Sequence, residues 1–108
     1  MPRYMIQETT TPQAAAGVLQ NPEDRTEVIR PIFEAVGGNL EQFYVSEAEN
    51  TVFLIADVPD QASLAAIMWA VSAGGGISSF RATPIVTASE AVDLFKKAAS
   101  VAYRPPGR

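Results

Sequence analysis

The stretch FYVSEAENTVFLIADVPD, residues 43–60, decides the fold that we expect for this chain. Two apolar runs with the alternation of strands flank a polar segment, residues 46–51, an arrangement typical of a β-hairpin. Glu47 and Glu49 raise the alternative of paired-carboxylate chemistry or a calcium site, but no third hard ligand is fixed nearby. Asn50 tolerates the left-handed backbone that a tight turn needs. We therefore interpret the segment as a solvated turn and not as a site.

The side chains of the two strands, residues 40–47 and 52–58, divide into two unlike sheet faces. With the turn centred on residues 49–50, Glu47 pairs with Val52. One face is then apolar and is expected to lie under helices; it carries Phe43, Val45, Val52, Leu54, Ala56 and Val58. The other face is too apolar for open water and too polar for a dry core; it carries Leu40, Gln42, Tyr44, Ser46, Phe53, Ile55 and Asp57.

The segments before the hairpin predict one strand and two helices. Residues 3–9 are rich in strand-forming side chains. Thr11 is a candidate N-cap for a short helix over residues 14–19. Asn21 is expected to cap a longer helix that ends at a glycine pair and bends at its interior Pro31.

The segments after the hairpin predict a helix, a strand and a final helix. Asp60 is expected to cap the first of these helices, whose inward stripe is Leu64, Ile67, Met68 and Val71. Residues 76–83 are expected to form the fourth strand. The capping box of residues 87–90 begins the last helix, whose inward side chains are expected to be Ala91, Leu94, Phe95 and Ala98.

This order of elements predicts an α+β fold of the ferredoxin-like βαββαβ plan with an extra C-terminal helix. We expect one domain, residues 1–101, followed by an extended or disordered tail, residues 102–108. In such a plan helices cover one sheet face, so Tyr44, Phe53 and Ile55 would form an exposed apolar patch on the other. Pairing of two copies through this face is the simplest way to cover it, and further assembly through the helices is the alternative.

The composition excludes several classes of function. The chain has 108 residues, 47% of them hydrophobic and 19% charged, as in a globular domain. Its net charge of −4 and its scattered cations argue against nucleic acid as a partner. Cysteine and histidine are both absent, which removes the commonest ligands for metals and haem and the commonest general base. We expect no metal, no cofactor and no membrane span, and a cytoplasmic location.

Several segments resemble the GYD-domain family, small proteins that are grouped with the dimeric α/β barrels. The resemblance covers nearly the whole chain and rests on NPEDR (21–25), EAVGGNLEQFY (34–44), ADVPD (56–60), AVSAGGGISSFRATPI (70–85) and SEAV (89–92). It implies a ferredoxin-like chain that pairs into a dimeric barrel. The family's hairpin carries Gly-Glu-Tyr-Asp, whereas this chain has Ala48, Glu49, Asn50 and Thr51, so only the glutamate is retained. The family implies no catalytic residue.

The mixed sheet face is where we expect a ligand, in the cavity between the two sheets of a homodimer. The candidate ligand-binding residues are Gln42, Tyr44, Phe53, Ile55, Asp57 and Arg81. Asp57 and Tyr44 are the candidate catalytic residues, because a desolvated carboxylate there could act as a general base. Glu8 is expected to meet the same polar group. The competing interpretation is that these side chains pair across the interface and seal it.

Trp69 is expected on the outer flank of its helix. There the last helix or the tail covers it, or it anchors a further subunit.

The function that these features favour is binding of a small apolar or aromatic molecule by a non-catalytic or regulatory homodimer. The first alternative is a cofactor-independent enzyme of the dimeric-barrel type, a monooxygenase, cyclase or isomerase, that uses Asp57, Tyr44 and Arg81. The second is a purely structural assembly module.

Overall fold

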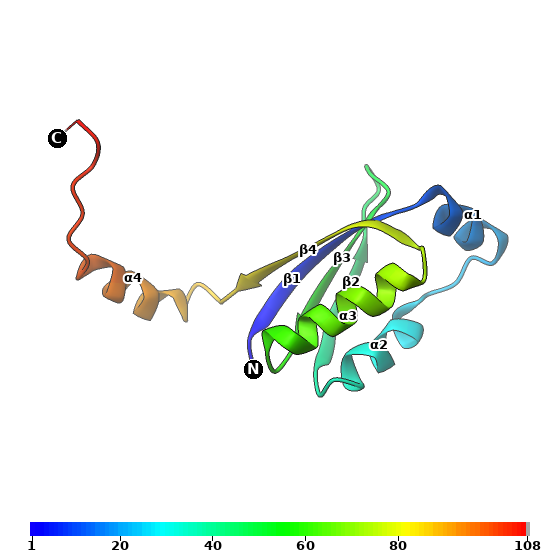
Figure 1. Ribbon diagram of the computed structural model, residues 1–108, viewed down its shortest axis with the longest axis horizontal. Coiled ribbons are helices and arrows are strands. Elements are labelled where there is room, and N and C mark those ends of the chain that lie inside the picture. The colour runs from blue at the N-terminus through cyan, green and yellow to red at the C-terminus, as the bar shows by residue number, and fades with distance from the viewer. Residues whose placement is uncertain (108) are drawn as a thin grey trace.

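The computed structural model describes residues 1–107 and has the α+β architecture of a ferredoxin-like fold (Figure 1). Four antiparallel strands form one sheet in the order β2-β3-β1-β4. The elements are β1 (Arg3–Thr10), α1 (Pro12–Gln20), α2 (Thr26–Glu34), β2 (Asn39–Val45), β3 (Thr51–Asp57), α3 (Gln61–Ala73), β4 (Ile77–Ile85) and α4 (Ala91–Ala99).

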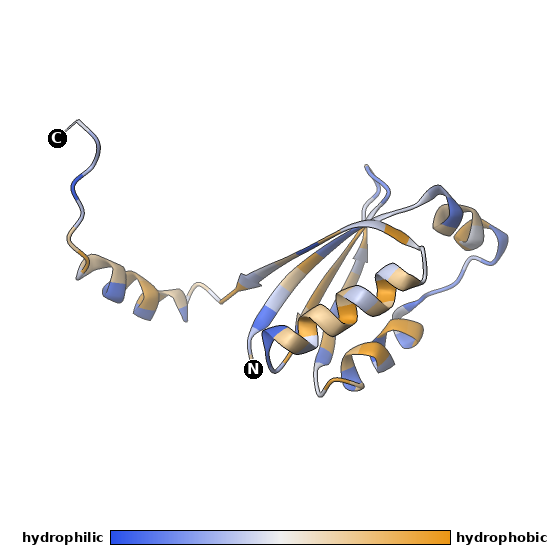
Figure 2. Ribbon diagram, viewed as in Figure 1, coloured by the Kyte–Doolittle hydropathy of each residue, from blue (hydrophilic) through white to orange (hydrophobic). Residues whose placement is uncertain are grey.

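The core lies between the sheet and helices α2 and α3. Its side chains are 0–2% exposed and comprise Ile6, Phe33, Leu40, Leu54, Ala56, Val58 and Ile67. Figure 2 shows α2 and α3 beside the sheet with many apolar residues along them, and Ile29, Ile32, Leu64 and Val71 pack against the core. The face of β3 that carries Leu54 and Ala56 is therefore the helix-covered face, as the hairpin pattern predicts, and Val58 just after the strand is buried with them.

The polar segment between β2 and β3 is a turn, as expected. Ser46 Oγ accepts hydrogen bonds from the backbone N–H groups of Ala48 and Glu49, both at 3.0 Å. Asn50 Nδ2 donates to the Thr10 carbonyl at 3.0 Å, which ties the turn to the end of β1. The expected left-handed backbone at Asn50 is wrong, because only glycines have positive φ in the described residues.

The register of the hairpin differs from the prediction by two residues. Val45, and not Glu47, lies opposite Val52, and the Ser46 N–H donates to the Thr51 carbonyl at 3.0 Å. The loop is thus longer than the two-residue turn that we expected. A shift of two residues keeps each side chain on its predicted face, because strand side chains alternate with a period of two.

Leu40 is the exception, since it lies in the helix-covered core and not on the mixed face. A β-bulge between Leu40 and Gln42 adds one residue, Glu41, to β2. The extra residue reverses the alternation, so Leu40 lies opposite Ala56 and is 2% exposed. Glu41 is turned to the open face instead.

The helix boundaries confirm most of the predicted caps. Thr11 Oγ1 accepts from the Ala14 N–H at 3.1 Å, and Asp60 Oδ1 accepts from the Ser63 N–H at 2.8 Å. Thr87 and Glu90 form the reciprocal capping box before α4, at 3.0 and 3.1 Å.

The predicted cap at Asn21 is wrong. Asn21 ends α1, with its N–H bonded to the Gly17 carbonyl, whereas α2 begins at Thr26, whose N–H donates to Asp24 Oδ1 at 2.9 Å. The N-cap residue of α2 is Arg25, and the Asp24 carboxylate before it accepts from the first helical N–H. Helix α2 continues through Pro31 as one element and ends before Gly37, whose φ is 79°.

The last helix does not pack inward, which corrects a further prediction. Helix α4 has no buried residue, with Leu94 58% and Phe95 64% exposed. It projects beyond the end of β4, away from the other helices (Figure 1), and the radius of gyration is 17.3 Å where a compact chain of this length has about 13 Å. Neither α4 nor the tail covers Trp69, which is 71% exposed on α3.

Candidate functional site

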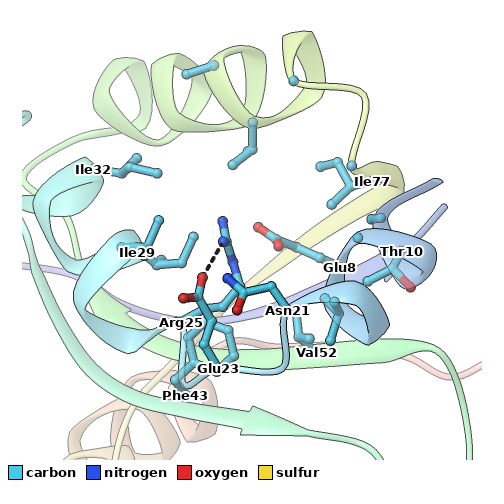
Figure 3. Close-up of a pocket in the computed structure, with 18 residues that line it drawn as sticks. Glu8, Thr10, Asn21, Glu23, Arg25, Ile29, Ile32, Phe43, Val52 and Ile77 are labelled. Carbon is cyan, nitrogen blue, oxygen red and sulfur yellow. Dashed lines mark hydrogen bonds and ion pairs between the residues drawn. The ribbon is translucent and has the colours of Figure 1, made fainter.

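A cavity of about 560 Å³ lies between the sheet and helices α1, α2 and α3 (Figure 3). Its walls are mostly apolar and include Val18, Val28, Ile29, Ile32, Phe43, Val52, Val71 and Ile77. The cavity is open to solvent on one side, and its volume and its mostly apolar lining with a few polar groups lie in the range of small-molecule pockets.

Glu8 is the one carboxylate that β1 contributes to this cavity. In the sheet register it lies opposite Val52 on one side and Phe80 on the other, which places it on the helix-covered face. Glu8 is 8% exposed and lines the cavity. Within residues 1–107 no hydrogen bond or ion pair holds its carboxylate, and burial raises its pKa above the ordinary value.

The segment between α1 and α2 supplies the polar groups at the mouth of the cavity. Arg25 Nη1 lies 3.2 Å from Glu23 Oε1, and Asn21 lines the same side. Figure 3 shows the Arg25 guanidinium turned toward the space in front of Glu8, but the ion pair that it makes is with Glu23. The positive charge nearest the cavity is thus already compensated, and the charge of Glu8 is not.

The sequence prediction missed this site because it placed Glu8 on the wrong face. Tyr4, Ile6 and Glu8 alternate along β1, so the buried Ile6 fixes Glu8 on the helix-covered side. A glutamate at a core position of a strand was the signal that could have revealed the cavity.

The residues predicted to bind a ligand lie on the open face, where one chain brings together only some of them. Tyr44 lies opposite Phe53, and Gln42 lies opposite Ile55. Arg81 lies opposite Gln7 in the same row as Phe53, but three strand spacings from Tyr44, about 14 Å. These side chains therefore form a broad surface and not a pocket within one chain.

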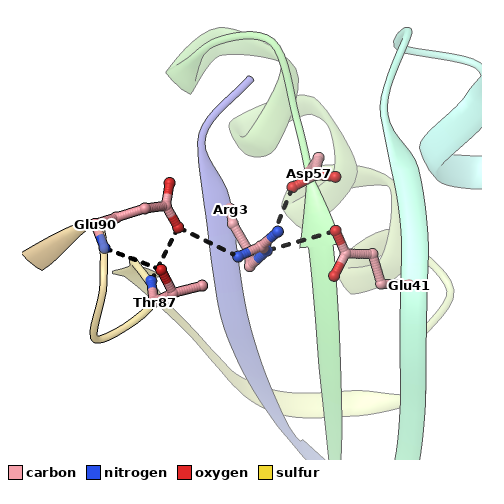
Figure 4. Close-up of polar contacts among 5 residues, drawn as sticks. All are labelled: Arg3, Glu41, Asp57, Thr87 and Glu90. Atoms are coloured by element: carbon pink, nitrogen blue, oxygen red, sulfur yellow. Dashed lines mark hydrogen bonds and ion pairs between the residues drawn. The ribbon is translucent and has the colours of Figure 1, made fainter.

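Asp57 lies at the end of the sheet, in a cluster organised by Arg3 (Figure 4). Arg3 Nε lies 3.4 Å from Glu41 Oε1 and 3.8 Å from Asp57 Oδ1, and Arg3 Nη1 lies 3.8 Å from Glu90 Oε1. Asp57 is four residues from Phe53 along β3, about 13 Å, so it is remote from Tyr44. Asp57 is instead part of an ion-pair cluster in which Arg3 joins the end of the sheet to Glu90, just before α4.

Among residues 1–107 no group of three acidic, histidine or cysteine side chains could hold a metal ion. No helix described by the structure is long and apolar enough to cross a membrane.

The comparisons with known proteins agree with this fold. The sequence matches the family model of the GYD domain over residues 4–94, most of the chain. No curated protein matches it. The crystal structure of an uncharacterized NIPSNAP domain protein from Burkholderia xenovorans is similar in fold, with a TM-score of 0.52 and 14% identity over 82% of this chain and 96% of that one. Because the family model spans β1 through the first half of α4, the chain belongs to the GYD-domain family.

Proposed function

We propose that this GYD-domain chain is a non-catalytic protein that binds a small, largely apolar molecule in the cavity beneath α1, α2 and α3. The observation that carries the proposal is Glu8, a residue only 8% exposed, whose carboxylate has no protein partner in residues 1–107 and lines a mostly apolar cavity of about 560 Å³. In the described residues no buried side-chain polar atom lacks a partner, so the oxygens of this carboxylate are reached by solvent from the cavity. A ligand group that donates to them would replace that solvent with a charge-assisted hydrogen bond.

Binding can be tested with 2-phenylethanol, a neutral probe small enough for the cavity. We expect it to shift the NMR methyl signals of Val52, Val71 and Ile77, which line the cavity, and to leave those of Val45 and Ile85 unchanged. Val52→Phe should block the shifts by filling the cavity. Val45→Phe is the matched control, because Val45 lies opposite Val52 in the sheet but does not line the cavity. Equal binding by both variants would refute this location.

We further propose that two copies pair through the open sheet face. The chain exposes 7613 Å², where a compact protein of this size exposes about 5,800 Å². The excess of about 1,800 Å² exceeds the roughly 800 Å² that each partner buries in a standard interface. Tyr44, Phe53 and Ile55 on the sheet and the bare apolar side of α4 supply this surface.

A cavity between the two facing sheets is the other location for a ligand. Tyr44 and Arg81 would then contact it from opposite edges of the sheet. Tyr44→Phe and Arg81→Gln would weaken binding, whereas Val52→Phe would not. The two locations are thus distinguished by which variants bind the probe.

A cofactor-independent acid–base enzyme is the second candidate, which Glu8 favours because its carboxyl lines the cavity and burial raises its pKa, as in carboxyl groups that act as general acids or bases. Mass spectrometry tests this candidate. The small molecules that remain bound after purification are identified before and after the protein is incubated. Conversion by the wild-type protein and retention without conversion by Glu8→Gln would support catalysis. An unchanged bound molecule in both proteins would support binding alone.

A further inference from the structure

We infer that the cavity selects molecules with an apolar body and a single protonated amine, which pairs with the carboxylate of Glu8. This inference rests on the proposed function and names its ligand class.

The position of Glu8 determines where the ligand's polar group lies. Glu8 lies between Val52 and Phe80 in the sheet register, so its side chain rises from the sheet into the floor of the cavity, which is lined mostly by apolar residues. No hydrogen bond or ion pair in residues 1–107 satisfies its carboxylate. A ligand group that donates hydrogen bonds is therefore expected at the floor, and an apolar body against α2 and α3.

The balance of charge around the cavity favours a cation over a neutral donor. The charged residues that line it are Glu8, Glu23 and Arg25. Arg25 is paired with Glu23 at 3.2 Å, so the uncompensated charge is that of Glu8. An ammonium group makes a stronger hydrogen bond to a carboxylate than a neutral hydroxyl does, and the net charge of −4 attracts cations to the protein.

The walls indicate the size and shape of the apolar body. Ile29 and Ile32 of α2 face Val71 of α3 across the cavity, and Phe43 and Val52 form the wall on the sheet. These side chains come from four different elements and offer no further buried charge. An aromatic ring or short branched chain fits a volume of about 560 Å³ and leaves one end free to reach Glu8.

Three probes of matched size test the inference: 2-phenylethylamine, 2-phenylethanol and 3-phenylpropanoate. We expect the amine to bind at least about tenfold more tightly than the alcohol, and the anion to bind most weakly. Calorimetry gives the affinities, and the methyl signals of Val52 and Ile77 show whether each probe occupies the cavity. The ranking in the wild-type protein needs no variant and so does not depend on a variant's folding.

Two variants then assign the preference to Glu8. Glu8→Gln keeps the size of the side chain and removes its charge, so the amine should lose its advantage over the alcohol. Glu47→Gln is the matched control, because it makes the same change in net charge at an exposed position of the turn. It should leave the ranking unchanged.

The outcomes separate the ligand class from the site. If the alcohol binds in the cavity as tightly as the amine, the amine class is wrong and the cavity remains a binding site. If Glu47→Gln abolishes the preference as Glu8→Gln does, the preference comes from net charge and the inference fails. If none of the three probes shifts the cavity methyl signals, the proposed function itself fails.

Discussion

Leu40 and Tyr44 lie on opposite faces of the sheet although they are four residues apart on the same strand. Leu40 is 2% exposed beneath the helices, and Tyr44 is 56% exposed on the open face. The β-bulge at Glu41 inserts one residue between them and so reverses the alternation. This single residue places Leu40 in the core and brings the Glu41 carboxylate to Arg3.

Deleting Glu41 is expected to destabilise the protein by about 2–4 kcal/mol, because a regular strand would turn Leu40 out of the core. Glu41→Ala keeps the bulge and loses only a partly exposed ion pair with Arg3, so it should cost less than about 1 kcal/mol. Urea denaturation of both variants measures the difference. Equal free energies of unfolding would show that the bulge does not hold Leu40 in place.

Glu8→Gln is expected to stabilise the ligand-free protein at pH 7 by about 1 kcal/mol, because burial of the charged carboxylate is unfavourable. The pKa of Glu8 in the folded chain is raised above 4.5 by burial. The folded state then holds this proton more tightly than the unfolded state, so the contribution of Glu8 to stability falls as the pH rises from about 4.5 through the folded pKa.

The stabilisation by Glu8→Gln should therefore become smaller as the pH is lowered toward 4.5. Glu23 and Arg25 are the other charged groups that line the cavity. Thermal unfolding at both pH values, with Glu47→Gln as the control, measures this. A gain of the same size at pH 7 and pH 4.5 would contradict a desolvated carboxylate.

Phe53→Glu is expected to prevent pairing of two copies, because it places a charge at the centre of the open sheet face. Trp69→Glu changes an exposed aromatic residue on α3 and should leave the dimer intact while removing any larger assembly. Analytical ultracentrifugation reports both results. A Phe53→Glu protein that still sediments as a dimer would place the interface elsewhere.

Removal of residues 87–108 is expected to leave the sheet and helices α1–α3 folded, because no residue of α4 is buried against the rest of the chain. An isolated helix of this length is marginal in water, so its apolar side needs a partner. We expect the melting temperature of the full chain to rise with protein concentration more than that of the shortened chain. The same concentration dependence in both would exclude α4 from the dimer.

Gly38→Ala is expected to cost about 1–3 kcal/mol, because the added Cβ would lie 2.5 Å from the Asp57 carbonyl oxygen. Gly17→Ala makes the same change in α1, where no atom lies within 4 Å, and should stabilise the chain by about 0.5–1 kcal/mol through helix propensity. Urea denaturation should therefore move the two midpoints in opposite directions. A neutral Gly38→Ala would mean that β2 and β3 can separate there without cost.

The local pattern of the sequence was enough to predict the type and order of most elements. Alternation identified the strands, and side chains such as Thr11, Asp60 and the Thr87–Glu90 box marked the starts of helices, because caps are satisfied within a few residues. The GYD resemblance and the ferredoxin-like plan are confirmed on this basis. The homodimer and the inter-sheet ligand stay predictions.

The tertiary structure alone decided which residues form the candidate site. The bulge at Glu41, the approach of α1 to α3 around the cavity and the projection of α4 depend on contacts between distant segments, which local propensity does not encode. Glu8 could be assigned to a face only through Ile6 and the strands on either side. Local sequence pattern was sufficient for the sheet and its helices, whereas packing in three dimensions placed a carboxylate without a protein partner beneath them.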